Sequence, residues 1–159
     1  MIKITVIALA SLKEKYLKDA AAEYIKRLSP YCNLKIIELD PVRLAENPSC
    51  AEINSALERE AELIVKKIPA GDYVVSLCIE GKQLSSEEFS GVLEEEMNIG
   101  RGITFIIGSS CGLADIIKRR ADLRLSFSKM TFPHQLFRVI LLEQIYRAFK
   151  ICSGGAYHK

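Results

Sequence analysis

Apolar residues follow two different periods along this chain, and the two kinds of segment alternate from its start to its end. Strict alternation, or a short continuous apolar run, predicts strands at residues 2–9, 34–39, 73–79, 103–107 and 123–126. Apolar positions three and four apart predict helices at residues 13–28, 50–67, 85–98, 114–120 and 134–152. Strands that alternate with helices predict one α/β domain over residues 1–159, with a mainly parallel sheet and helices on both faces.

Composition fits a single folded domain of ordinary size. The 159 residues are 49% hydrophobic and 26% charged, which excludes intrinsic disorder. No apolar run approaches the roughly 20 residues of a membrane span, and the first residues do not resemble a secretory signal. Five cysteines without C-x-x-C spacing and only two histidines make a metal site improbable. We therefore expect a cytoplasmic protein with free thiols, no metal and no membrane partner.

Charge is distributed unevenly along the chain. Residues 1–100 carry 12 Lys and Arg against 17 Asp and Glu, whereas residues 101–159 carry 10 against 3. A basic segment on an otherwise acidic chain favours a polyanionic partner. The alternative is that this segment forms a solvated face, whose charges are balanced by acidic residues from the first part of the chain.

Candidate chemistry gathers after three of the predicted strands. Ligands of parallel α/β sheets bind beyond the carboxyl ends of the strands, and glycine there lets a ligand approach the backbone closely. The three segments are residues 76–82, 107–112 and 125–134. Cys111, between Ser110 and Gly112 at a helix start, is also a candidate nucleophile with His134 as its base, although a small residue in a ligand-binding loop explains it better.

The last predicted helix has apolar residues around nearly its whole circumference. Only Glu143, Arg147 and Lys150 form a polar stripe. A helix of this kind must be covered on two sides, so we predict that the sheet covers one side and a second copy of the chain the other, in a symmetric homodimer. The terminal Tyr157, His158 and Lys159 follow two glycines that could act as a hinge for closure over a site.

Several motifs resemble a known family. They are LKEKYLKDAAAEYIKRLSPY, QLSSEEF, FSKMTFPHQLFRVILLEQIYRAFKI and the terminal YHK. They resemble the bacterial ribosomal RNA large-subunit methyltransferases that act on N3 of a pseudouridine, a family of the SPOUT superfamily. The similarity spans essentially the whole chain.

The resemblance implies a SPOUT-type domain with a C-terminal trefoil knot, a homodimer, and S-adenosylmethionine as cofactor. Ordinary α/β connections are unknotted, so the knot is expected from the resemblance alone. Carried over by position, it implies cofactor contacts at Leu77, Gly108, Phe127, Ser128, Lys129, Met130, Thr131 and Phe132. Family members usually have two glycines where this chain has Gly108 and Ser109, so the serine is expected to narrow the loop without preventing binding.

The implied substrate is 23S ribosomal RNA, within an assembled large subunit or a 70S ribosome, and not DNA. N3 of the base must lose a proton before it can attack a methyl group. We expect the partner subunit's tail to cover the base, with Tyr157 and His158 catalytic and Arg138 or Arg147 assisting. His158 is the natural proton acceptor near neutral pH, but a cation that stabilises the imide anion would serve without a base. A noncatalytic RNA- or ribosome-binding module remains the alternative function.

Overall fold

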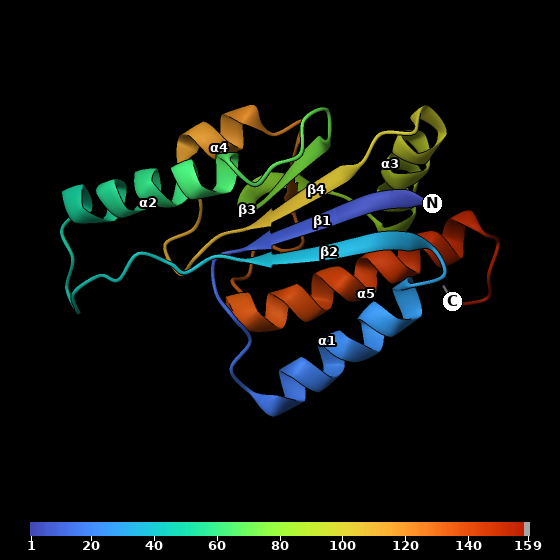
Figure 1. The fold of residues 1–159 in the computed structure, drawn as a ribbon, viewed down its shortest axis with the longest axis horizontal. Helices are drawn as coiled ribbons and strands as arrows, with labels where there is room; N and C mark the ends of the chain where they lie inside the picture. The colour runs from blue at the N-terminus through green and yellow to red at the C-terminus, as the bar shows by residue number, and fades with distance from the viewer. Residues whose placement is uncertain (158–159) are drawn as a thin grey trace.

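A five-stranded parallel sheet forms the centre of the protein (Figure 1). The computed structural model describes residues 1–157. The strands are β1 (Ile2–Ala8), β2 (Cys32–Glu38), β3 (Tyr73–Gln83), β4 (Ile103–Ile107) and β5 (Leu123–Ser126), in the spatial order β2-β1-β4-β3-β5 with every neighbouring pair parallel. The helices are α1 (Lys15–Leu28), α2 (Cys50–Val65), α3 (Ser86–Ile99), α4 (Asp115–Arg120) and α5 (His134–Cys152). The predicted α/β class with a parallel sheet is confirmed.

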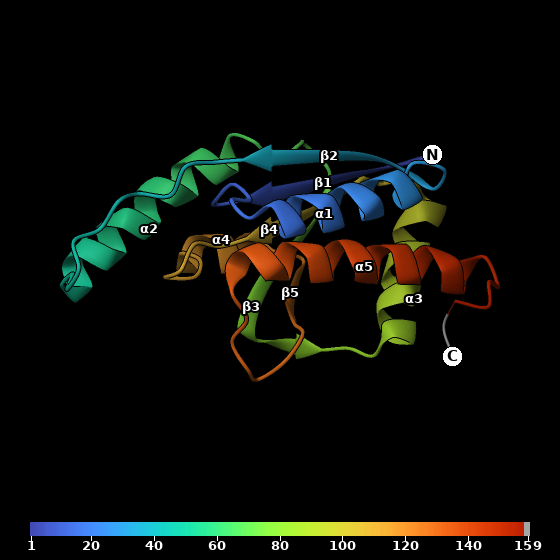
Figure 2. The same cartoon turned by 90° about the horizontal axis from the view of Figure 1, so that it is seen from below.

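Helices cover both faces of the sheet, as Figures 1 and 2 show. Alternate residues of β1 point in opposite directions: Ile4 and Val6 join a core with α1, α3 and α5, while Ile7 joins a second core with α2 and α4. All five residues of β4 are buried, which explains why four of them, all except Thr104, are apolar. Among residues 1–157, no helix combines the length and the apolar character needed to cross a membrane.

The central helix α5 is covered largely by its own chain. It packs against α1 and α3 as well as the sheet, and the ring of Tyr31 stacks on that of Phe149 with centroids 5.6 Å apart. The prediction that a second copy covers the other side of α5 took no account of these two helices, and the homodimer stays a prediction. The apolar circumference of α5 therefore does not by itself require a dimer.

Strand β3 is longer than predicted and bends in its middle. Leu125 of β5 lies opposite both Leu77 and Lys82, so four residues of β3 bulge out between them. The two backbones come so close at Gly81 that a β-carbon there would lie 2.7 Å from the carbonyl carbon of Arg124. The bulge brings residues 78–81 to the carboxyl end of the sheet. The trefoil knot implied by the family resemblance stays a prediction.

The close approach at Gly81 predicts a stability effect. Gly81→Ala should lower the free energy of unfolding by about 1–3 kcal/mol, because β3 and β5 must separate to admit the methyl group. Gly91→Ala is the matched control: Gly91 is exposed on α3 with no atom within 4 Å of an added β-carbon, so it should gain about 0.5–1 kcal/mol of stability. Urea denaturation measures both, and equal stabilities for Gly81→Ala and the wild type would contradict the packing.

Candidate functional site

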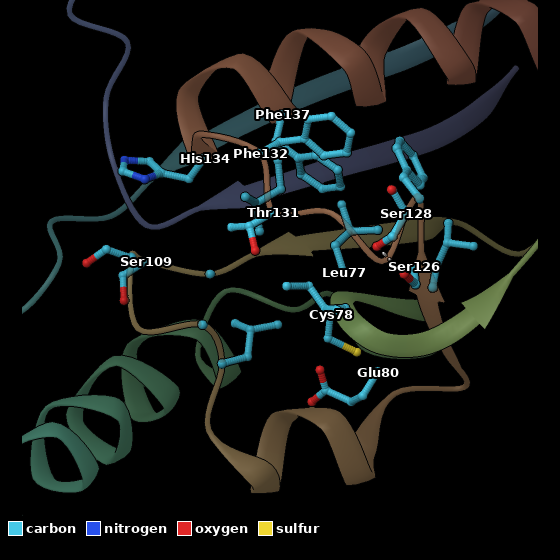
Figure 3. Close-up of a pocket in the computed structure, with 18 of the residues that line it drawn as sticks. Leu77, Cys78, Glu80, Ser109, Ser126, Ser128, Thr131, Phe132, His134 and Phe137 are labelled. Atoms are coloured by element: carbon cyan, nitrogen blue, oxygen red, sulfur yellow. Dashed lines mark hydrogen bonds between the residues drawn. The ribbon is translucent and has the colours of Figure 1, made fainter. Parts of the chain in front are cut away.

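A cavity of about 750 Å³ lies beyond the carboxyl ends of β3, β4 and β5 (Figure 3). Residues from the three predicted site segments, 76–82, 107–112 and 125–134, come together in its walls. Of the eight predicted cofactor contacts, seven line the cavity: Leu77, Gly108, Phe127, Ser128, Met130, Thr131 and Phe132. Lys129 is not among the lining residues. The volume falls within the range of small-molecule sites, about 300–1,000 Å³.

One wall is the tight turn after β4. Gly112 has a positive φ of 84°, and its amide donates a hydrogen bond to the carbonyl of Ser109 at 2.9 Å. A β-carbon at Gly108 would collide with the backbone carbonyl of Gly112, so only glycine fits there. The hydroxyl of Ser109 donates to a carboxylate oxygen of Glu60 on α2 at 3.1 Å. The side chain that was expected to narrow the loop is therefore held by a neighbouring helix.

The opposite wall is the loop between β5 and α5. Ser126 donates to the carbonyl of Ser128 at 3.0 Å, and the Ser128 hydroxyl accepts from the amide of Met130 at 3.0 Å. The ring centroid of Phe137 lies 4.9 Å from that of Phe127 and 6.1 Å from that of Phe132, with Phe132 and Phe137 stacked. Short local hydrogen bonds and an aromatic cluster thus shape a wall that presents both backbone polar groups and apolar surface.

Charged and titratable groups that sequence reasoning did not assign also line the cavity. Glu80 forms an ion pair with Lys118, and this ammonium lowers the pKa of the Glu80 carboxyl. Burial raises the pKa of the Cys78 thiol, so that it stays protonated at neutral pH. Residues 76–82 were predicted to belong to a site. The ion pair between Glu80 and Lys118 of α4 could not be predicted, because it forms only when the chain folds.

His134 lies at the rim of the cavity, at the first residue of α5 (Figure 3). Partial burial, followed by the positive charges of Arg138 and Lys13, lowers its pKa. The imidazole is therefore neutral at physiological pH and can accept a hydrogen bond or a proton from a group in the cavity.

The predicted catalytic arginine Arg138 lies outside the cavity lining. Its side chain is buried, forms an ion pair with Glu38 and donates to the carbonyl of Ala10. Glu38 is the last residue of β2, and Ala10 lies just beyond the carboxyl end of β1. In this structure Arg138 fastens the start of α5 to the sheet.

Arg147 and Tyr157 lie near the far end of α5. The guanidinium of Arg147 pairs with Glu143 at 2.7 Å and lies 4.8 Å from the ring centroid of Tyr157. The Tyr157 hydroxyl donates to Glu143 at 3.3 Å, and its ring contacts Tyr146 with centroids 5.0 Å apart. The other predicted catalytic residue, His158, lies outside the described residues.

Tyr157 and the cavity are thus at opposite ends of α5, because His134, the first residue of this helix, lines the cavity. This helix of 19 residues is roughly 28 Å long. Burial raises the pKa of Tyr157, so its phenol is a proton donor at neutral pH. Within residues 1–157, no group of three His, Cys, Asp or Glu side chains is placed to hold a metal ion.

Comparison with known proteins identifies the class to which this fold and cavity belong. The family model described as "Predicted SPOUT methyltransferase" matches residues 2–158. The chain belongs to the SPOUT methyltransferase family, which confirms the enzyme class and favours a catalytic protein over a noncatalytic module. Enzymes of this family use S-adenosylmethionine, so the cofactor prediction is confirmed as well.

Relatives over the full length carry a more particular name. Proteins called "Ribosomal RNA large subunit methyltransferase H" are 51% identical in Carboxydothermus hydrogenoformans (99% of each chain), and 52% identical in Clostridium acetobutylicum and in Leuconostoc mesenteroides (98% of this chain and 99% of theirs). A solved structure of a probable methylase family protein from Haemophilus influenzae shares the fold, with a TM-score of 0.56 at 13% identity, over 98% of this chain and 70% of that one.

The lowered pKa of His134 predicts an effect of pH on stability. Because the unfolded state takes up the proton first, the wild type should lose stability as pH falls from 7 through the ordinary histidine pKa of about 6.5. His134→Gln should lose less over the same interval. Urea denaturation at pH 8, 7, 6 and 5.5 measures this, and a stability difference between the two proteins that does not change with pH would contradict the prediction.

Proposed function

We propose that this protein methylates N3 of a pseudouridine in the 23S RNA of the large ribosomal subunit. The observation that carries the proposal is the identity of about half of all residues, over the full chain length, with proteins named as large-subunit ribosomal RNA methyltransferases. The cavity is where we place the reaction, because it has the size and wall chemistry that the methyl donor requires.

The residues of the cavity fit S-adenosylmethionine. Gly108 lets the turn after β4 pack tightly against Gly112 and itself lines the cavity, so the donor can contact the backbone there. Leu77 and the aromatic cluster of Phe127 and Phe132 offer apolar surface to an adenine ring. Ser128 and Thr131 supply polar groups close by. When bound, the donor supplies a methyl group on a sulfonium, which is already electrophilic.

The protein's own task is to align the base and to manage its N3 proton. Alignment alone contributes several kcal/mol to catalysis when the near-attack geometry is enforced. We assign the proton to the partner subunit's His158, with the partner subunit's Tyr157 donating a hydrogen bond to the base, since its raised pKa keeps the phenol protonated. The partner subunit's Arg147 stabilises the anion that forms. Arg138 contributes by holding the start of α5 against the sheet.

A homodimer supplies the missing half of the site. Each tail begins roughly one helix length from the cavity of its own chain, so closure over the base calls for the tail of another copy. Apolar side chains are exposed at the cavity and at the start of α5: the lining residue Met130 is 75% exposed, and Phe132 of the lining and Leu136 of α5 are more than one-third exposed. A second copy that covers this surface buries these residues and brings its tail across.

The substrate we propose is an assembled large subunit or a 70S ribosome in the cytoplasm, not DNA. The chain is one small domain, so a preassembled particle must offer most of the docking surface. Exposed Arg119 and Arg120 of α4 lie next to Lys118 at the cavity wall, where they can contact RNA phosphates.

Mass mapping of ribosomal RNA nucleosides tests the function directly. Cells that lack the protein should lack one N3-methylated pseudouridine in 23S RNA. Incubating their ribosomes with the purified protein and S-adenosylmethionine should restore it. As a control, the same ribosomes are incubated with the Gly108→Val variant, whose added side chain would collide with Gly112. These ribosomes should stay unmethylated. An unchanged nucleoside map in the deleted cells would contradict the proposed substrate.

The tail hypothesis predicts complementation between two inactive variants. Removing residues 157–159 should abolish methylation while leaving the affinity for S-adenosylmethionine within about twofold of the wild type. Gly108→Val should also be inactive, because it loses the cofactor. Coexpressed together, the two should recover about a quarter of wild-type activity, since half of the dimers are mixed and each has one complete site. No recovery in dimers that are shown to be mixed would place the tail on its own chain's site.

A further inference from the structure

The carboxylate of Glu60 on α2 is buried and holds two distant segments at once. Only 4% of the residue is exposed. One oxygen accepts a hydrogen bond from the backbone amide of Val42 at 3.0 Å, and the other accepts from the hydroxyl of Ser109 at 3.1 Å. The proposed mechanism gives this residue no task.

Burial makes both bonds necessary to the carboxylate. An acidic side chain removed from water is costly unless its oxygens are hydrogen-bonded, and buried Glu is rare without such partners. Glu58 and Glu62 on the same helix are exposed, so water can hydrogen-bond to their carboxylates. Glu60 is thus satisfied only while Ser109 and Val42 stay in place.

The two partners of Glu60 differ in their surroundings. Ser109 follows Gly108 in the tight turn that lines the cavity, and Figure 3 shows it at the edge of the site. Val42 belongs to the irregular segment 39–49, which connects β2 to α2 and leaves the body of the protein (Figure 1). One carboxylate therefore joins the cofactor turn to a long connection 67 positions earlier in the chain.

We infer that Glu60 is a positioning residue for the methyl donor. Through Ser109 it fixes the turn after β4 in the conformation that admits the donor, and through Val42 it ties segment 39–49 to the same turn. Donor binding at the turn then also restrains the segment. The inference rests on the proposed placement of the donor in this cavity.

Calorimetric titration with S-adenosylmethionine tests the first link. Ser109→Ala removes only the hydroxyl and should weaken donor binding by about tenfold or more, the effect of losing one hydrogen bond to a charged group. Glu60→Ala should weaken binding at least as much, and adding Ser109→Ala to it should change nothing more. Glu60→Gln keeps an oxygen for Val42 and an amide that can donate to Ser109, so it should recover most of the affinity.

Kinetics separate positioning from general damage. The KM for the donor should rise in Ser109→Ala while kcat at saturating donor stays within about twofold, because the turn still adopts its conformation once the donor is bound. Glu62→Ala, an exposed carboxylate two residues along α2, is the matched control and should leave both constants unchanged.

Hydrogen exchange tests the second link. Adding the donor should slow exchange of the Val42 amide in the wild type and have a smaller effect in Ser109→Ala. If the wild type binds the donor and Ser109→Ala binds it equally well, the inference is wrong even where Glu60→Ala fails to fold. If the wild type itself does not bind the donor, the proposed function fails first and the inference falls with it.

Discussion

Close contact between backbone segments at the carboxyl edge of the sheet is the constraint on which the site depends. Gly81 lies against the backbone of Arg124, and Gly108 lies against that of Gly112. A side chain at either position would push the segments apart. These main-chain contacts set the positions of the strand ends around the cavity, and the side chains of the β5–α5 loop complete its opposite wall.

The sequence predicted the elements well because burial on both faces leaves a strong pattern. The mostly apolar stretches of β3 and β4 were recognisable in the sequence, and in the structure Ser49 and Ser85 form capping boxes at the starts of α2 and α3. The strand ends that form the cavity followed from the same reasoning. The bulge of β3 was not predicted, since its only signal is a glycine that also suits an ordinary turn.

Residues whose roles depend on tertiary contacts were beyond the reach of sequence patterns. Glu60 stands in an acidic helix beside Glu58 and Glu62, and periodicity does not show which of them meets a distant serine. Arg138 was expected near the substrate because of its charge, but its partners are Glu38 and Ala10, which lie more than 90 positions earlier. The cover of α5 by α1 and α3 likewise appears only when the chain folds.

The two ends of α5 serve different halves of the proposed reaction, and one rigid helix connects them. Arg138 fastens the first turns to the ends of β1 and β2, beside the cavity, while Tyr157 packs on Tyr146 near the last turns. A helix held in this way cannot bring its own tail to its own cavity by bending. In the homodimer that we propose, a two-fold axis perpendicular to α5 would reverse the direction of the second helix and set each tail beside the other cavity. In the function that we propose, dimerisation therefore completes the catalytic site, and a single chain binds the methyl donor without being able to use it.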